Sequence, residues 1–205
     1  PNFARAYYGL AAITHMDVML GLSKSPKDSR MKAIELCQKA TSLDETLAGA
    51  YGLLGYLNVQ IGEYERGIQA GERAIEVGPS SADAHSLLAQ VLNFSGRAQE
   101  AIALNEKAFR LNPVGPTTYY YTHASFSYIL TGRYEDAVRI TRQELSRTPN
   151  NVLAYARLVW ALSASGHDEE AKAAAQSVLR IDPKFSAKRL ASSLNFKDPS
   201  VAPSY

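Results

Sequence analysis

The chain has 205 residues, of which 46% are hydrophobic, 20% charged and 9% aromatic, a globular composition that excludes a charge-rich disordered chain. The 22 Lys and Arg residues nearly balance the 20 Asp and Glu residues, so the net charge of +2 does not indicate nucleic-acid binding. A single cysteine, Cys37, cannot form an intramolecular disulfide, which leaves the redox compartment open.

A fixed repeat predicts the secondary structure. Four prolines are separated by 34, 36 and 34 residues, and four glycines keep the same spacings: Pro79, Pro113, Pro149 and Pro183, with Gly62, Gly96, Gly132 and Gly166. Each glycine follows an apolar run with helical spacing, and a second such run leads to each proline. Glycine commonly ends a helix, and proline disfavours helix in the preceding residue. Each unit therefore predicts two helices joined by a turn, and such pairs must stack to bury their apolar faces.

In chain order, residues 1–47 form an irregular first unit with an insertion around residues 20–29. Four regular units follow at 48–81, 82–115, 118–151 and 152–185, with Pro116 and Thr117 inserted between the second and third of them. Residues 186–197 are expected to form a capping helix, and residues 198–205 a loose tail. Pro1 falls at a repeat-closing position, so we expect the chain to be part of a longer protein.

The longest stretch without Asp, Glu, Lys or Arg runs from residue 111 to residue 132, which is long enough for a membrane span. It contains Asn112, Pro113, Gly115 and Pro116, and proline breaks a helix. The stretch therefore predicts a loop followed by an aromatic-rich helix. No membrane insertion is expected in this chain.

These units resemble the tetratricopeptide repeat (TPR). The matching positions are an aromatic or histidine, a small residue in the second helix, and the closing proline, as in Tyr51, Gly67 and Pro79 of one unit. The resemblance covers about nine-tenths of the chain. It implies an all-α fold, a right-handed α-solenoid with a C-terminal capping helix. The sequence departs from the pattern at single positions: Glu45, Gly71, Asn105, Thr141, Glu144 and Val159.

A narrower resemblance is to the C-terminal TPR region of bacterial class III adenylate/guanylate cyclases and TolB-like regulatory proteins. It is carried by the segments YYGLAAITHMDVMLG, EYERGIQAGERAIEVGPSSADAHSLLAQVLNFSGRAQEAIALNEKAFRLNP and LRIDPKFSAKRLASSLNFKDPS, and most specifically by the Phe-Lys-Asp-Pro sequence at 196–199. This resemblance implies the regulatory part of a larger bacterial signalling protein whose catalytic domain lies outside this chain. A cytoplasmic location is favoured, or a periplasmic one if the parent has an N-terminal membrane span.

Catalytic and metal-binding motifs are missing from the sequence. There is no phosphate-binding glycine loop, no G-x-S-x-G and no H-E-x-x-H. His15, His85, His123 and His167 are scattered, with no pair at ligand spacing. His85 is expected to be a core residue and Cys37 an unreactive buried thiol. We therefore expect no enzyme activity, no metal and no cofactor.

The TPR resemblance implies that the first helix of each pair lines a concave groove. By register, the candidate partner-binding residues are Tyr8, Gly52, Tyr56, Gln60, Gln90, Asn93, Phe94, Tyr119, Phe126 and Trp160. Five of them form an aromatic ladder, and the three amides would hydrogen-bond a peptide backbone. Gly49 and Gly52 would leave a notch beside Tyr56. The basic residues that hold chaperone tails in other TPR domains are absent at the fifth and ninth positions, which disfavours that ligand.

The sequence therefore predicts a protein–protein interaction scaffold that binds a peptide or a neighbouring domain. Some aromatics, Trp160 among them, could instead pack against the next repeat or against a C-terminal helix folded into the groove. The alternative function is a structural module that docks on its parent protein or forms a homodimer through the exposed region near Met16, Val18, Met19 and Leu20.

Overall fold

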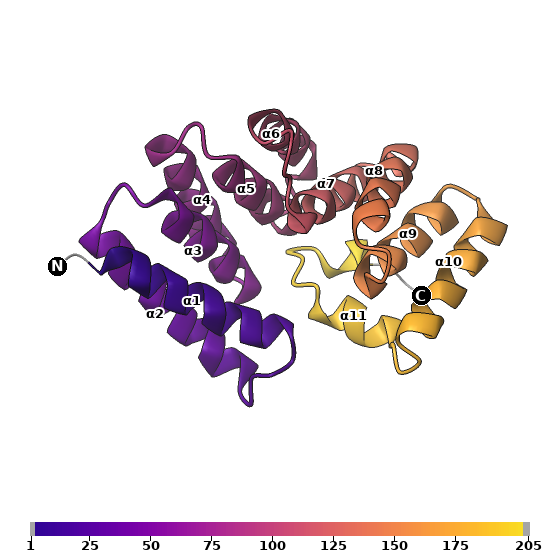
Figure 1. Ribbon diagram of the computed structural model, residues 1–205, viewed down its shortest axis with the longest axis horizontal. Helices are drawn as coiled ribbons and strands as arrows, with labels where there is room; N and C mark the ends of the chain where they lie inside the picture. Colours follow the sequence, from indigo (N-terminus) through magenta and orange to yellow (C-terminus); the bar gives the residue numbers. More distant parts are fainter. Residues whose placement is uncertain (1–2, 203–205) are drawn as a thin grey trace.

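The computed structural model describes residues 3–202, so Pro1 lies outside the described residues. Within this range the chain forms eleven α-helices and one short 3-10 helix, with no strand, which confirms the all-α solenoid. The first ten helices form five pairs that stack into an arc (Figure 1). The pairs are α1 (Ala4–Met19) with α2 (Pro26–Leu43), α3 (Ala48–Gln60) with α4 (Tyr64–Val77), α5 (Ala82–Phe94) with α6 (Ala98–Leu111), α7 (Thr118–Leu130) with α8 (Tyr134–Arg147), and α9 (Val152–Ala164) with α10 (Asp168–Ile181).

Glycine turns the chain between the two helices of each regular pair. The φ angles are 87°, 80°, 74° and 78° at Gly62, Gly96, Gly132 and Gly166, in the left-handed region that glycine adopts without strain. The residue after each glycine donates its N–H back to a carbonyl five residues earlier, as Glu63 does to Asn58 at 2.9 Å. This is the helix-ending geometry expected from the repeat. Gly21, with φ of 69°, ends the first helix of the irregular pair in the same way.

The buried core is a succession of three clusters along the arc. One lies between α1, α2 and α3, one is centred on α5, and one lies among α6 to α10. Small residues allow the closest approaches: a Cβ atom added to Gly55 of α3 would lie 2.8 Å from the carbonyl oxygen of Gly67 in α4. Each pair therefore packs mainly on its neighbours, as stacked repeats do.

The C-terminal end departs from a simple capping helix. In place of the expected helix at 186–197, α11 spans Ala187–Ser193, and none of its residues is buried. Residues 194–202, which we call the C-terminal segment, turn back toward the inside of the arc (Figure 1). They contain the 3-10 helix η1 (Pro199–Val201), which Asp198 caps by accepting a hydrogen bond from the N–H of Ser200. The tail expected to be loose is thus ordered over 198–202, and residues 203–205 lie outside the described range.

A candidate binding groove on the concave face

An aromatic row runs along the inside of the arc, with one side chain from each of four consecutive first helices. We define the aromatic row as Tyr56, Phe94, Phe126 and Trp160. The ring centroids of Tyr56 and Phe94 lie 6.2 Å apart. Phe126 lies 6.3 Å from Phe94 on one side and 6.3 Å from Trp160 on the other. His15 extends the row at its N-terminal end, 5.3 Å from Tyr56. The spacings are those of interacting aromatic pairs.

Tyr119 does not belong to this row. It lies at the start of α7, where its hydroxyl donates to Asp83 at 2.6 Å, and Tyr120 donates to the same carboxylate oxygen at 2.5 Å. Burial and the neighbouring Asp83 carboxylate raise the pKa of both phenols. Tyr119 therefore joins α7 to α5, and its predicted place in the aromatic ladder is corrected. Register alone could not separate it, because its partner Asp83 lies 36 residues earlier in the chain.

The C-terminal segment occupies the middle of the groove. Phe196 is 4% exposed, and its ring centroid lies 5.1 Å from that of Phe94 and 6.1 Å from that of Phe126. Phe196 is thus seated on the aromatic row from inside the arc. The sequence alternative in which a C-terminal element fills the groove applies here, although an extended segment, not a helix, makes the contact.

Polar contacts fix the segment in register. The side-chain amide of Asn195 donates to the main-chain carbonyl of Gln60 at 3.0 Å and to its Oε1 atom at 3.3 Å. The main-chain N–H of Lys197 donates to the carbonyl of Phe94 at 2.8 Å. Gln60 and Phe94 are the last residues of α3 and α5, where helix ends leave carbonyls available. The segment therefore binds two successive helix ends as well as the aromatic row.

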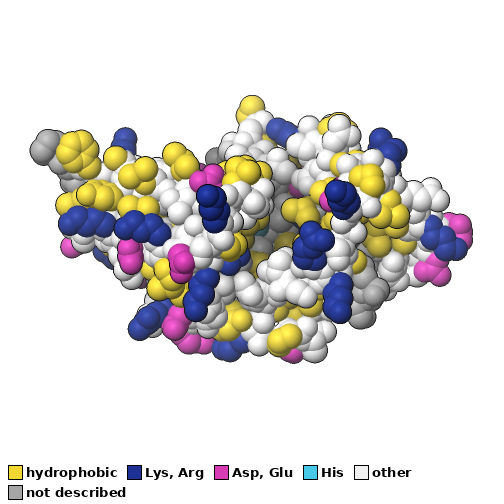
Figure 2. Space-filling view, turned by 90° about the horizontal axis from the view of Figure 1, so that it is seen from below, with side chains coloured by type: hydrophobic (Ala, Val, Ile, Leu, Met, Phe, Trp, Pro, Cys, Tyr) yellow, Lys and Arg dark blue, Asp and Glu magenta, His cyan; other side chains and the backbone are white. Residues whose placement is uncertain are grey.

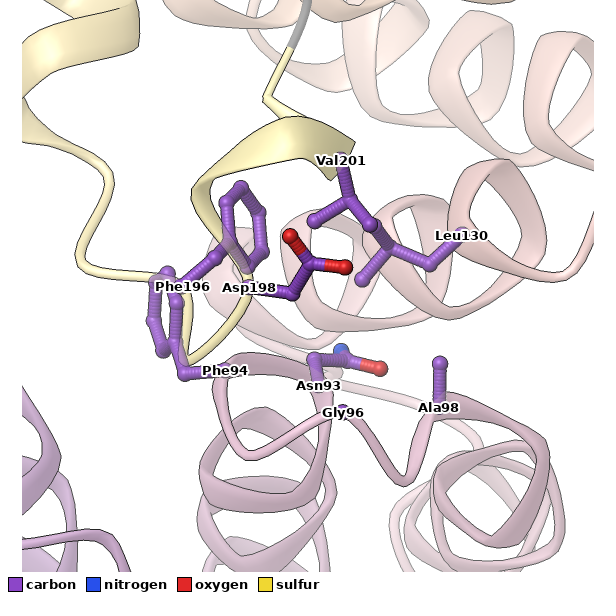
Figure 3. Close-up of a pocket in the computed structure, with 8 residues that line it drawn as sticks. All are labelled: Asn93, Phe94, Gly96, Ala98, Leu130, Phe196, Asp198 and Val201. Atoms are coloured by element: carbon purple, nitrogen blue, oxygen red, sulfur yellow. The ribbon is translucent and has the colours of Figure 1, made fainter.

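A cavity of about 100 Å³ remains beside the segment. Figure 3 shows Phe196 next to Phe94, with Asn93 on one side of the cavity and Leu130 and Val201 on the other. Figure 2 views the molecule from the concave side and shows a hollow near the middle in which hydrophobic side chains are visible. The segment thus fills the groove incompletely.

The other predicted amides are engaged inside the protein. Asn93 is 1% exposed, donates to the carbonyl of His123 at 2.9 Å, and accepts from Ser127 at 2.8 Å. Gln90 is 3% exposed and accepts from Asn93 at 3.2 Å. Asn93 joins α5 to α7, and Gln90 is buried against Asn93, so neither presents its amide to a peptide as predicted. Of the three predicted amides, Gln60 is the one that contacts the C-terminal segment.

The predicted glycine notch is filled by side chains of the chain itself. A Cβ atom on buried Gly52 would lie 2.9 Å from Cδ1 of Leu87, and one on Gly49 would lie 3.0 Å from the ring of Tyr8. Gly52 therefore permits packing of α3 on α5, and Gly49 accommodates Tyr8, which is half-buried. The notch interpretation is corrected to close helix packing.

Burial keeps two titratable side chains of the aromatic region, His15 and Tyr56, uncharged at neutral pH. Burial, together with the nearby positive charge of Arg30, lowers the pKa of His15 to about 4. Burial raises the pKa of Tyr56 to about 12. Both side chains are therefore neutral at pH 7. Burial also raises the pKa of Cys37 to about 12, so this thiol stays protonated and unreactive.

One charged pair lies behind the row. Arg157 and Glu144 are 5% and 1% exposed and form an ion pair of 2.6 Å, and the guanidinium lies over the ring of Phe126 at 5.7 Å. Sequence reasoning missed this support. The signal was present in Glu144, which stands where the repeat pattern has a small residue.

Residues 3–202 contain neither a metal-binding cluster nor a membrane-spanning helix. No group of three or more His, Cys, Asp or Glu side chains is placed to hold a metal ion in this part of the chain. No helix within the same residues has the length and apolarity needed to cross a membrane.

Comparisons with known proteins identify the repeats. Two family models described as tetratricopeptide repeat match residues 53–116 and 128–194. A search of curated proteins finds no match. The narrower resemblance to cyclase and TolB-like regulatory regions receives no support from these matches.

Solved structures share the fold. PilW, described as a widely conserved type IV pilus biogenesis factor, is 16% identical with a TM-score of 0.76, over 98% of this chain and 90% of PilW. The MamA protein is 20% identical with a TM-score of 0.61, over 89% and 93% of the two chains. YrrB, described as a TPR protein with an unusual peptide-binding site, is 19% identical with a TM-score of 0.60, over 87% and 86%. At these identities the likeness shows the fold. The chain is therefore built from tetratricopeptide repeats stacked into an α-solenoid.

Proposed function

We propose that the chain is a non-catalytic protein-interaction scaffold whose concave groove binds an extended peptide segment or a segment of a neighbouring domain. The observation that carries this proposal is the C-terminal segment, which runs through the groove with one buried ring, one main-chain hydrogen bond and one side-chain amide on helix-end carbonyls. These are the contacts by which proteins recognise peptides. The fold neighbour YrrB is described as having a peptide-binding site, which is consistent with this use of the fold.

The aromatic row supplies the affinity in this proposal. Aromatic side chains bury a large area with few rotatable bonds, and a few such residues usually carry most of the binding energy. Tyr56 and Trp160 are half-buried and flank the section of the row that Phe196 covers. They therefore leave ring surface beside the C-terminal segment for a longer ligand or a second one.

A peptide array probed with the full chain tests the proposal. The double substitution Tyr56→Ala with Trp160→Ala is expected to lower the affinity for the captured peptides by at least tenfold, because interface hot spots carry most of the binding energy. Tyr134→Ala is the matched control, because Tyr134 is a half-buried aromatic of the α8 core cluster outside the groove. Equal capture by the double variant and the control would discard the groove as the binding site.

We also propose that the repeats are the regulatory part of a larger bacterial signalling protein. The support is the cyclase-like and TolB-like sequence resemblance, whose most specific element, residues 196–199, includes the phenylalanine that fills the groove. The coding sequence upstream of Pro1 tests this: a nucleotide-cyclase domain in frame is expected, and an unrelated domain there would contradict it.

A second candidate function is association of two copies of the chain. Phe3, Ile13 and Leu20 are 59%, 62% and 63% exposed on or beside α1, and exposed apolar rows of this kind mark interfaces. Light scattering over a range of concentrations is expected to show a dimer that Ile13→Glu dissociates. A monomer at all concentrations would remove this candidate.

A further inference from the structure

We propose that the partner of the groove is an extended peptide with the chemistry of residues 195–197, a carboxamide, an aromatic ring and a cation in succession, and that it binds by displacing the C-terminal segment. The inference rests on the proposed function and adds the identity of the ligand to it. It follows from the side-chain chemistry that the groove allows at each of these three positions.

The central position requires a planar apolar side chain. Phe196 meets Phe94 at an interplanar angle of 44°, a tilted arrangement, and Phe126 at 69°, an edge-to-face arrangement. The Arg157 guanidinium makes a cation–π contact with the ring of Phe126, which helps to hold that ring in place. An aliphatic residue would keep the burial but lose these ring contacts, so an aromatic residue is preferred here.

The preceding position requires a hydrogen-bond donor. The two groups that face the Asn195 amide are both oxygens of Gln60, one main-chain and one side-chain. A carboxylate in place of the amide would place negative charge against two acceptors, so aspartate is excluded. The following residue must carry a main-chain N–H for the carbonyl of Phe94, and proline is therefore excluded after the aromatic.

The following position favours a cation. The Lys197 ammonium lies 3.1 Å from Glu65 and 5.9 Å from the ring centroid of Tyr64. The Lys197 and Glu65 side chains are 51% and 75% exposed, so the pair adds little affinity and mainly sets preference. An acidic residue at this position would be repelled by Glu65.

The segment is held in a way that allows exchange. Within the described residues beyond Ile181, Phe196 is the one buried side chain, and α11, which leads to it, has none. Detachment therefore exposes one buried ring together with the partly buried Leu194 and Ala202, and it breaks few hydrogen bonds. The segment competes with a partner peptide because its covalent link to the repeats gives it a high effective concentration at the groove.

A labelled synthetic peptide, SSLNFKDPS, tests the inference by fluorescence anisotropy against the full chain. Phe196→Ser, which empties the central position, is expected to bind the peptide at least tenfold more tightly than the unchanged chain does. The intrinsic fluorescence of Trp160, the single tryptophan, is expected to change on binding because its ring neighbours Phe126. If Phe196→Ser fails to fold by circular dichroism, Asn195→Asp combined with Lys197→Glu releases the segment without removing the buried ring.

Three peptide controls define the chemistry. Replacing Phe by Ala, Asn by Asp, or Lys by Glu in the peptide is expected to weaken binding, most strongly for Phe. No binding of SSLNFKDPS to either folded variant overturns the inference. A variant that instead dimerises by exchanging its own segment also overturns it, because the occupant would then be a second copy. Array peptides that need Tyr56 and Trp160 but lack the amide–aromatic–cation pattern would refute this inference while leaving groove binding intact.

Discussion

Three polar residues that depart from the repeat pattern have their partners on neighbouring helices. Glu144, at a position usually held by a small residue, pairs with Arg157 and accepts from Asn151 at 2.9 Å. Thr141, where an aromatic is usual, shares a hydrogen bond of 2.8 Å with Ser125. Asn105, at the equivalent position one repeat earlier, donates to Ser127 at 2.9 Å. These departures therefore place buried polar contacts between successive helices from α6 to α9.

The buried Glu144–Arg157 ion pair makes the stability of the chain sensitive to single substitutions. Arg157→Met leaves a buried carboxylate unpaired and is expected to lower the free energy of unfolding by about 3–5 kcal/mol. The double variant Glu144→Leu with Arg157→Met is expected to lose much less, since neither charge remains buried. Urea denaturation measures both.

Arg73→Met provides the control, because Arg73 forms its ion pair with Glu76 on the surface. It is expected to leave the urea midpoint nearly unchanged. A double variant as unstable as Arg157→Met alone would show that packing, not the unpaired charge, accounts for the loss.

Because His123 is buried in its neutral form, the chain is expected to lose stability in acid. Burial, with repulsion from Arg157, lowers its pKa to about 3, whereas an unfolded histidine titrates near 6.5. Between these values the unfolded chain binds one proton more than the folded chain, so stability falls as the pH falls. The loss approaches 1.4 kcal/mol per pH unit, about 2 kcal/mol between pH 6.5 and pH 5.

The contribution of His123 can be isolated with His123→Asn, which retains a donor for the carbonyl of Ser86, 2.9 Å from Nδ1 in the native chain. The variant is expected to be less stable at pH 7, with the difference from the native chain shrinking by about 2 kcal/mol at pH 5. His15, whose pKa is also lowered, is present in both chains and cancels. A difference that stays constant between the two pH values would contradict the assignment.

At the scale of helices, glycines inside helices differ in whether they are needed for close packing. Gly55 is buried where α3 meets the backbone of α4, so Gly55→Ala is expected to destabilise the chain by about 1–3 kcal/mol through overpacking. Gly9 of α1 has no atom within 4 Å of an added Cβ, so Gly9→Ala is expected to stabilise by about 1 kcal/mol through helix propensity. Thermal unfolding of the two variants checks the opposite signs, and equal signs would refute the close-packing interpretation.

The regular helices could be predicted because their signals are local. The left-handed glycines stand at the predicted turns, and Pro26, in the expected insertion, begins α2. The contents of the groove could not be predicted in the same way. Asn93 and Tyr119 occupy groove positions by register, but their partners His123 and Asp83 lie 30 and 36 residues away. Such pairings depend on how neighbouring repeats rotate against each other, and the repeat spacing does not specify this rotation.

At the scale of the whole molecule, the C-terminal segment contacts three stacked repeats at once. Asn195 bonds Gln60 of α3 across 135 residues, and Phe196 contacts Phe94 of α5 and Phe126 of α7. A solenoid held by neighbour contacts alone can flex between its repeats. The segment contacts α3, α5 and α7 from inside the arc, and we expect these contacts to restrict changes in its curvature.

Releasing the segment is therefore expected to open the arc. Small-angle X-ray scattering of Phe196→Ser should give a larger radius of gyration than the native chain at the same concentration. Lys197→Ala removes the exposed contacts with Glu65 and Tyr64 but keeps the buried ring, and it is expected to leave the radius unchanged. Identical radii for the native chain and Phe196→Ser would show that stacking alone sets the curvature.

The position of residues 194–202 also sets an order of events during synthesis. The ribosome makes the chain from its N-terminus, and each repeat pair can stack once its neighbour has emerged. The groove between α3 and α7 is therefore complete before Phe196 has been added. Throughout that interval Tyr56, Phe94 and Phe126 have no C-terminal segment beside them, so we expect a partner available at the ribosome to meet no competitor there.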